Sequence, residues 1–447
     1  MNAHRPAWSV AVLLLLFTTT LPATDYYVHA DHPSARDSNP GTLAAPWRTL
    51  THAVETARAG DIVHIRAGIY REQLLTVRAG SDGDGAIVFA AYAGERPVID
   101  GEGVETGSNG VLVSHAHIVL RGIEIRNWVC GVWMEFASFV EISDCEVHNC
   151  VFGVGASFGT HHFTLNRVSM HHFDLYGFDA SPGGGLDCHT GVLNDCVAHT
   201  GRDRDQNVDG FALGHGTQHG FEFNRCVAYN VFDGFDISSR DTTLNACVAY
   251  DCWNGAYKLW QDNVSLVNCV GYGSVGSNVE LDWDDEPGTT TLINCTFHDA
   301  HTYNIWVENS RDRLVMYNTI LSGGRNIGLA FEQMGVENYQ GDWNLFQNEN
   351  PHRAICVAYT DEFSLEDLRR GAWTAYSGQD RNSIVVTAGD ALFADPASSD
   401  FRPVQGSPAI DRGTSEGAPP VDADGTPRAQ GRGIDIGAYE YQPPQRR

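Results

Sequence analysis

Three short phrases of similar sequence place carboxylates close to a lysine. The phrases are Asn207-Val-Asp-Gly-Phe-Ala-Leu, Phe232-Asp-Gly-Phe-Asp-Ile and Trp253-Asn-Gly-Ala-Tyr-Lys-Leu. If they are successive rungs of one coil, Ala212, Asp236 and Lys258 share an outward column, and Asp209 stands over Asp233 just before it. Carboxylates beside a lysine on a rigid framework are suited to metal-assisted proton abstraction.

The aspartates of this stretch are candidate metal ligands. The candidates are Asp205, Asp209, Asp233 and Asp236. Closely packed carboxylates repel one another unless a cation is bound, and Ca²⁺ accepts about 6–8 oxygen ligands in loose geometry. No His or Cys grouping has the spacing of a zinc site. A solvated acidic face with Asp-Gly turns is the alternative, but Asp236 lies within a predicted strand rather than at a corner.

Lys258 is the candidate catalytic base, because the chain has few lysines and this one lies inside a predicted strand. A surface lysine there would simply pair with Asp236 or Glu280. As a base it needs a pKa well below ~10.4; burial and a nearby cation act in that direction, and carboxylates oppose them. With a metal holding a uronic acid's carboxylate, lysine would remove the C5 proton and the 4-linked sugar would leave by β-elimination.

Five further residues are candidate substrate contacts. They are Arg204, Arg240, Tyr257, Trp260 and Glu280. Arginines hold carboxylates through paired hydrogen bonds, and aromatic rings stack on sugar faces. Pairing of the arginines with local aspartates, and burial of the aromatic rings as partial core, remain open as alternatives.

A repeat in the middle of the chain predicts the framework. From about residue 110 to 350, a marker recurs at spacings of 21 to 30 residues with a floor near 22, which is typical of a solenoid with loops of variable length. The markers are Gly122, Cys145, Arg167, Cys196, Cys226, Cys247, Cys269, Cys295, Asn318 and Asn344. Apolar and polar residues alternate around each marker, which predicts strands. We therefore expect an all-β parallel β-helix with rungs about 4.8 Å apart.

The same reading predicts one column of outward side chains in the second half of each coil. Its members are Trp133, Gly155, Asp179, Ala212, Asp236, Lys258, Glu280 and Trp306. Placing Lys258 in this column requires counting Ala256 as one extra residue in its rung.

The two ends of the chain differ from the repeat. Residues 24–109 are expected to form an N-terminal cap and first coils, with Thr49 capping a short helix that Gly60 stops. Residues 110–350 form the β-helix that carries the site, and 351–447 the last coils and an irregular C-terminal cap. Residues 1–23, with the apolar run Val10–Phe17, resemble a signal peptide and predict a secreted, extracellular or periplasmic protein.

Composition restricts the partners. A net charge of −27 argues against nucleic acid, and it disfavours an acidic polymer unless cations bridge the two. No membrane association is expected after signal cleavage, and we expect a monomer. Six of the eleven cysteines fall at the repeat marker, where Cys acts as a small inward hydrophobe. Local bridges Cys145–Cys150 and Cys247–Cys252 remain open.

The stretch resembles polysaccharide lyase family 9, the pectate lyase-like β-helix proteins. The resemblance rests on Asp209-Gly-Phe, Asp233-Gly-Phe-Asp and Asn254-Gly-Ala-Tyr-Lys, and more broadly on phrases near Pro46-Trp-Arg-Thr-Leu and Ser407-Pro-Ala-Ile-Asp. It implies a right-handed parallel β-helix, a Ca²⁺ site at Asp209, Asp233 and Asp236, and Lys258 as the base of a lyase acting on an acidic polysaccharide. Phe232 stands where the family usually has a further Asp.

Two other functions stay open. Tyr176-Gly-Phe-Asp179 resembles the first half of a mannuronan C5-epimerase motif, although Ala180 and Ser181 stand where Pro and His are expected. A non-catalytic carbohydrate-binding β-helix is the second alternative, since such folds persist after activity is lost. A hydrolase of the polygalacturonase kind is disfavoured because its His-Gly and Arg-x-Lys phrases are not evident.

Overall fold

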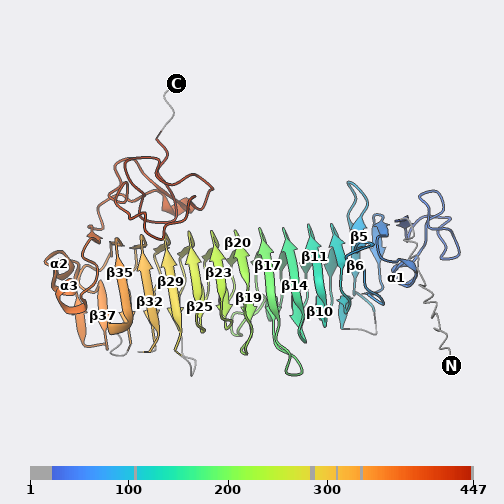
Figure 1. Cartoon of the computed structure of the whole chain (residues 1–447), viewed down its shortest axis with the longest axis horizontal. Helices are drawn as coiled ribbons and strands as arrows, with labels where there is room; N and C mark the ends of the chain where they lie inside the picture. The colour runs from blue at the N-terminus through green and yellow to red at the C-terminus, as the bar shows by residue number, and fades with distance from the viewer. Residues whose placement is uncertain (1–22, 105–107, 282–286, 309–310, 333–335, 444–447) are drawn as a thin grey trace, which may run out of the picture.

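A computed structural model describes residues 23–104, 108–281, 287–308, 311–332 and 336–443. Almost all of the predicted signal segment 1–23 therefore lies outside the described residues. Within them, three sheets of 13 strands run the length of the molecule, and each coil adds one strand to each sheet (Figure 1). The predicted all-β parallel β-helix is confirmed, with parallel pairing throughout except between the last two strands of one sheet.

We call the three sheets I, II and III. Sheet I contains β1 (Asp25–Val28), β2 (Ile62–Ile65), β5 (Ile87–Ala91), β8 (Ile118–Arg121), β11 (Ser138–Ser143), β14 (His161–Asn166), β17 (His189–Asn194), β20 (Glu222–Asn224), β23 (Thr242–Asn245), β26 (Val264–Val267), β29 (Thr289–Ile293), β32 (Arg313–Tyr317) and β35 (Tyr339–Asp342).

Sheet II contains β4 (Leu74–Leu75), β7 (Asn109–Val113), β10 (Cys130–Glu135), β13 (Phe152–Ser157), β16 (Tyr176–Ala180), β19 (Asp209–Leu213), β22 (Phe235–Ile237), β25 (Tyr257–Leu259), β28 (Ser277–Leu281), β31 (Tyr303–Val307), β34 (Ile327–Phe331), β37 (Ile355–Val357) and β38 (Asp361–Phe363).

Sheet III contains β3 (Gly68–Tyr70), β6 (Pro97–Asp100), β9 (Glu124–Arg126), β12 (Glu146–His148), β15 (Ser169–His171), β18 (Val197–His199), β21 (Val227–Tyr229), β24 (Val248–Tyr250), β27 (Val270–Tyr272), β30 (Thr296–His298), β33 (Ile320–Ser322), β36 (Leu345–Phe346) and β39 (Ile384–Val385). Two short strands, β40 (Phe393–Asp395) and β41 (Asp400–Pro403), pair outside the coil.

A left-handed residue bends the chain from sheet I to sheet III in each coil. The residue before each marker cysteine has a φ of 52° to 56°, as in Asp195 and Asn268. Gly122, Arg167 and Asn318 also have positive φ, so they are equivalent to the residue before Cys. The predicted marker was therefore wrong by one position in these three coils. Buried Ile123, Val168 and Thr319 stand where the other coils have Cys.

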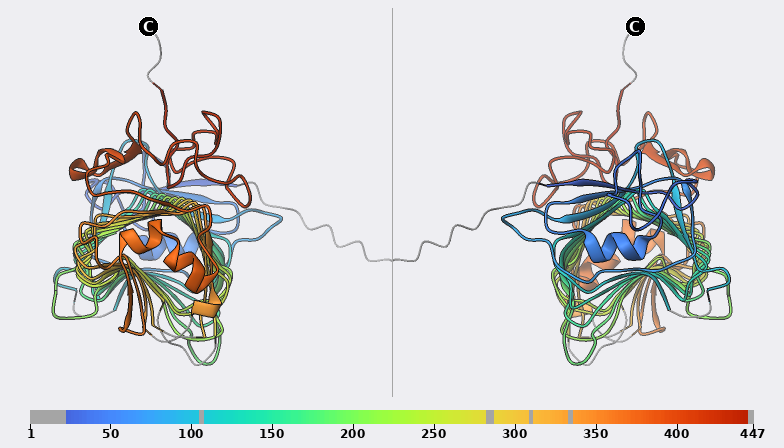
Figure 2. Two further views of the ribbon diagram at one scale, coloured as in Figure 1. Left: turned by 90° about the vertical axis from the view of Figure 1, so that its left-hand side faces the viewer. Right: turned by 90° about the vertical axis from the view of Figure 1, so that its right-hand side faces the viewer.

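Helices cover both ends of the solenoid (Figure 2). At the N-terminal end lies α1 (Leu50–Thr56), where the Thr49 side chain accepts a hydrogen bond from the His52 N–H, as predicted. At the other end lie α2 (Leu365–Arg369) and α3 (Ala372–Ser377), and Ser364 and Asp367 form a capping box at α2. Two 3₁₀ turns, η1 (Val336–Asn338) and η2 (Pro396–Ser398), complete the elements. Covering the ends shields the apolar interior from water.

After α3 the chain turns back and packs along the outside of the coil (Figure 1). The side-chain amides of Asn268, Asn294 and Asn318 donate to backbone carbonyls of the segment 414–437. The buried pair Arg428–Glu440, 2.8 Å apart, holds the same segment together. These contacts confirm the irregular C-terminal cap.

One continuous apolar core fills the coil from α1 to α3. All eleven cysteines are buried and none forms a disulfide, so the local bridges that the sequence left open are absent. None of the helices among the described residues is both long and apolar enough to span a membrane.

Candidate active site

Sheet II carries the predicted outward column. Strand pairing sets Asp236 beside Lys258 and Lys258 beside Glu280 on three successive rungs. The column in chain order is Trp133, Gly155, Asp179, Ala212, Asp236, Lys258, Glu280 and Trp306, as predicted. Neighbouring rungs are about 4.8 Å apart, so a polymer that lies along the column passes several of these side chains.

The third phrase contains no extra residue relative to the coil before it. Phe235 pairs with Tyr257, and the Phe235 N–H donates to the Ala256 carbonyl at 3.0 Å. Continuing this register, Ala256 stands opposite Gly234 and Gly255 stands one position earlier. The outward direction of Lys258 therefore follows from an unbroken register rather than from an insertion.

Asp209 and Asp233 form a stacked, fully buried pair at the start of these strands. The Asp233 N–H donates to Asp209 Oδ1 at 3.1 Å, and Asn207 donates to Asp209 Oδ2 at 2.9 Å. Asp233 Oδ1 accepts from Asn254 Nδ2 at 2.9 Å and from the Gly255 N–H at 2.7 Å. Asp233 Oδ2 is buried without a hydrogen-bond partner among the described residues.

Burial and mutual repulsion favour the protonated forms of this pair. Burial, then the charges of Asp233 and Asp236, hold the pKa of Asp209 well above its usual value. Burial and the Asp236 charge raise the pKa of Asp233 to about 7, while Asn254, Lys258 and Gly255 act in the opposite direction. Two buried carboxyl groups resist ionising together because their charges repel. A cation bound between them would offset this repulsion, so the pair is a candidate cation site.

Lys258 is the only lysine in the 447-residue chain, a stronger signal than the general scarcity that pointed to it. Its side chain is 18% exposed, and its Nζ lies 4.0 Å from Glu280 Oε1. The same nitrogen lies 4.5 Å from the ring centre of Trp260, whose indole donates to Asp236 Oδ1 at 2.6 Å. The amine is thus held between a carboxylate and an aromatic face, and enough of it reaches solvent to meet a ligand.

The donor chemistry of the pair fits a hard cation, but the predicted four-carboxylate cluster is not assembled. No group of three or more His, Cys, Asp or Glu side chains in the described part of the chain is arranged to hold a metal. Asp205 lies in an exposed loop, where its N–H donates to Asp203 Oδ1. The fit rests instead on the buried oxygens of Asp209 and Asp233, including the unpartnered Asp233 Oδ2, with Asp236 on the same rung as Asp233.

One predicted substrate contact is wrong. Tyr257 is fully buried, stacks on Phe235 with ring centres 5.2 Å apart, and donates to the carbonyls of Cys247 and Val270. The alternation that turns Lys258 outward turns its neighbour inward. Tyr257 is a core residue.

The two predicted arginines occupy different surroundings. Arg204 is exposed in the loop before β19, and its guanidinium lies 4.9 Å from the ring centre of Trp253. Arg240 is exposed at the corner between β22 and β23, where its backbone pairs with that of Gln218 and His219. Roles of Arg204, Arg240, Trp260 and Glu280 in binding substrate remain predictions.

Two asparagines outside the predicted set of site residues take part in the site. Asn207 and Asn254 each donate a side-chain N–H to one of the buried aspartates. Asn207 begins the first phrase, two residues before Asp209, and Asn254 is the second residue of the third phrase, one residue before Gly255. Their position just ahead of the turns at Asp209 and Gly255 was the available signal.

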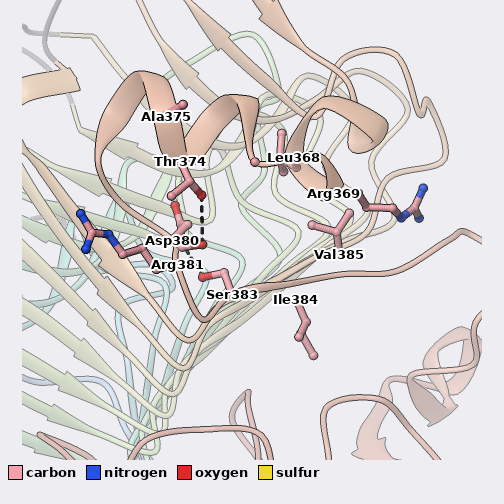
Figure 3. A pocket seen from close by; sticks show the side chains of 10 residues that line it. Leu368, Arg369, Thr374, Ala375, Asp380, Arg381, Ser383, Ile384 and Val385 are labelled. Atoms are coloured by element: carbon pink, nitrogen blue, oxygen red, sulfur yellow. Dashed lines mark hydrogen bonds between the residues drawn. The ribbon is translucent and has the colours of Figure 1, made fainter.

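A pocket of about 700 Å³ lies between α2, α3 and β39 at the C-terminal end (Figure 3). Its lining includes Asp380, whose carboxylate accepts hydrogen bonds from Tyr339, Trp373 and Ser383. None of the predicted site residues lines it. Asp380 holds the cap on the last coil.

Comparison with known proteins places this chain in a family. The family described as "Pel9A-like, right handed beta helix region" matches residues 26–320. The pectate lyase PEL9 of Emericella nidulans is 27% identical over 234 residues, 51% of this chain and 53% of that protein. The uncharacterized protein YwoF of Bacillus subtilis is 38% identical over 99 residues, 21% of each chain. The chain thus spans about a fifth and about half of the length of these relatives.

Two solved structures share the fold. The crystal structure of pectate lyase Pel9A superimposes with a TM-score of 0.58 at 16% identity, covering 94% of this chain and 97% of that one. The complex of XylC with xylose superimposes with a TM-score of 0.51 at 10% identity, covering 93% and 99%. At these identities the likeness concerns the fold alone.

Proposed function

Because the chain belongs to the Pel9A-like right-handed β-helix family, we propose that it is an exported, Ca²⁺-dependent polysaccharide lyase. Its substrate is a uronic-acid polymer of the pectate type, cleaved by β-elimination with Lys258 as the base. The observation that supports this most directly is the pairing of Asp236, Lys258 and Glu280 on successive rungs beside the buried Asp209–Asp233 pair.

Lys258 takes the C5 proton of the uronate in this mechanism. The electron pair of the C5–H bond forms the C4–C5 double bond, the C4–O bond breaks, and the departing sugar oxygen takes a proton from water; Lys258 then releases its proton to the solvent. Trp260 and Glu280 fix the position of Nζ on two sides. Asp209 and Asp233, with Asp236 above Lys258, would hold Ca²⁺; the ion would bind the substrate carboxylate and stabilise the charge that develops as the proton leaves.

The metal also accounts for the charge balance of the complex. A chain of net charge −27 and an anionic polymer repel each other at long range. A cation shared by the protein carboxylates and the substrate carboxylate removes this repulsion at the point of reaction. Export is inferred from the N-terminal apolar run. It would place the protein outside the cytoplasm, where such polymers occur and where Ca²⁺ sites of millimolar affinity are common.

The direct test is the ultraviolet absorbance of unsaturated uronates during incubation with polygalacturonate, with Ca²⁺ or with a chelator. We expect product with Ca²⁺ only, and none from Lys258→Ala. Arg225→Ala is the matched control, because Arg225 is an exposed cation paired with Asp195 on another face. Epimerised, uncleaved polymer would favour the C5-epimerase instead. The absence of any reaction on every uronate polymer would exclude both enzymes and favour the non-catalytic carbohydrate-binding protein.

A further inference from the structure

Three half-buried aromatic rings form a row on sheet II, on the N-terminal side of the acidic pair. We call Trp133, Phe152 and Tyr176 the aromatic row. The rings of Trp133 and Phe152 are 5.7 Å apart and nearly perpendicular, and those of Phe152 and Tyr176 are 5.9 Å apart. They come from β10, β13 and β16, three neighbouring strands of the sheet.

Trp133 is held in one orientation. Its indole N–H donates to Ser157 Oγ at 3.0 Å. Its benzene ring occupies the space above Gly155, where a Cβ would lie only 2.1 Å from Cζ3. Glycine at this position in the outward column therefore lets the ring lie along the sheet. A fixed, partly exposed ring of this kind loses little conformational entropy when a ligand packs on it.

The aromatic row is continuous with the candidate active site. Tyr176 is the strand partner of Asp209, and the charges of Asp209, Asp179 and Asp236 add to burial in raising the pKa of its phenol. Five rungs separate Trp133 from Lys258, so the two side chains stand about 24 Å apart along the axis. A polymer that lies along the column reaches both, whereas a short oligomer at Lys258 does not.

The apolar surface extends beyond the aromatic row at the same end. Phe136 and Phe158, at the corners that follow β10 and β13, stack with ring centres 5.1 Å apart, and Phe136 is 60% exposed. Exposed aromatic residues that cluster next to a site mark a surface that binds a ligand or partner. Their lack of charge matters here, because an uncharged surface can bind an anionic chain beside Asp179 and Asp209 without a cation.

We propose that the aromatic row is a polysaccharide-binding subsite that holds the substrate chain on the N-terminal side of Lys258. Sugar rings pack their C–H faces on the indole of Trp133 and on the rings of Phe152 and Tyr176. This assignment rests on the proposed function for the choice of an acidic polysaccharide. It assigns the row a role in binding and none in proton transfer.

Binding without turnover tests the row separately from catalysis. In the Lys258→Ala background, the added change Trp133→Ala should weaken retardation in gels that contain polygalacturonate by about tenfold in affinity, the equivalent of one stacking contact. The added change Phe139→Ala is the control, since Phe139 is 49% exposed but stacks on His117 at sheet I. Circular dichroism and the melting temperature of each variant show whether the fold is kept.

The second test of the aromatic row measures the kinetics of variants that keep Lys258. Trp133→Ala should reduce kcat/KM on long polygalacturonate about tenfold and leave that on the shortest cleaved oligomer unchanged. Equal losses on both lengths, or unchanged gel retardation, would overturn the subsite while leaving the lyase intact. Absence of any retardation of the Lys258→Ala parent would overturn the proposed function and this inference with it.

Discussion

Lys258 can be addressed alone by chemistry, because every other basic side chain apart from histidine is arginine. Acetylation with an N-hydroxysuccinimide ester can modify only this amine and the α-amino group. We expect loss of activity in proportion to acetylation of Lys258, since an amide nitrogen cannot accept the proton. Intact-mass analysis and peptide mapping follow the modification. The Lys258→Arg variant is the control, because it has no side-chain amine to acetylate. Full activity of the wild-type protein after complete acetylation would exclude Lys258 as the base.

Asp233 should make the metal-free protein less stable as pH rises. Its pKa of about 7 lies above the ordinary 3.8, so the folded state binds the extra proton between these values. Stability from this group is therefore complete below about pH 4 and is lost as pH rises through 7, by about 1.4 kcal/mol per unit at the steepest. Asp233→Asn should make that slope shallower in denaturant unfolding with chelator present, and Asp209, whose pKa is also raised, contributes to the slope that remains.

The control for this pH experiment is Asp195→Asn. Arg225 holds the pKa of Asp195 below its usual value, so its contribution stays constant between pH 4 and 7. A slope that is the same in wild type and in Asp233→Asn would contradict the buried, protonated carboxyl.

At the scale of the strands, the column was predictable because each coil repeats one bend. The left-handed residue before Cys196 or Cys269 fixes where every coil turns, and strict alternation then fixes which side chains face outward. Three coils without Cys shifted the marker by one position, yet the outward column in sheet II was predicted independently of that marker. Asp236 and Lys258 were therefore placed correctly in that column, although the extra residue counted at Ala256 is absent.

Loops and buried polar contacts were less predictable. Asp205 precedes β19 by four residues, and loop geometry rather than strand period decides whether its carboxylate reaches Asp209. The role of Asn254 depends on an amide that reaches across one rung to Asp233, which no periodicity reveals. The need for glycine at position 255 was equally hidden from any periodicity. A Cβ at this position would lie 3.0 Å from Asp233 Oδ1, the same oxygen that accepts a hydrogen bond from the Gly255 N–H.

The attachment of the C-terminal segment should depend on Arg428 and Glu440. Both side chains are almost fully buried, and Arg428 also donates to Asn268 Oδ1 and to two backbone carbonyls. Glu440→Ala leaves a buried guanidinium without its carboxylate, which should cost about 3–5 kcal/mol in denaturant unfolding. Glu366→Ala removes an exposed partner of Arg370 and should cost less than about 1 kcal/mol. Similar losses in the two variants would show that the segment is held by its apolar contacts.

Over the whole molecule, the stacked coils behave as a nearly one-dimensional array with protected ends. Each coil packs on its two neighbours, so opening begins where a neighbour is missing. The helices α1, α2 and α3 oppose this at the two ends, and the C-terminal segment adds a third clamp from the side, at Asn268, Asn294 and Asn318. The coils next to the clamp, which carry β26, β29 and β32 close to the C-terminal end of the solenoid, should therefore open later than the coils at either end.

The eleven buried cysteines report the order of opening. In the native protein an alkylating reagent should modify none of them. In pulses at rising denaturant, Cys356 in the last coil of sheet II and Cys130 near the first coils should react before Cys269 and Cys295. Cys269 and Cys295 lie one residue after Asn268 and Asn294, which anchor the C-terminal segment. Peptide mass mapping measures each site. In Glu440→Ala, Cys269 and Cys295 should lose their delay, because the clamp has been released. Simultaneous labelling of all eleven sites in both proteins would instead show a solenoid that opens as one unit.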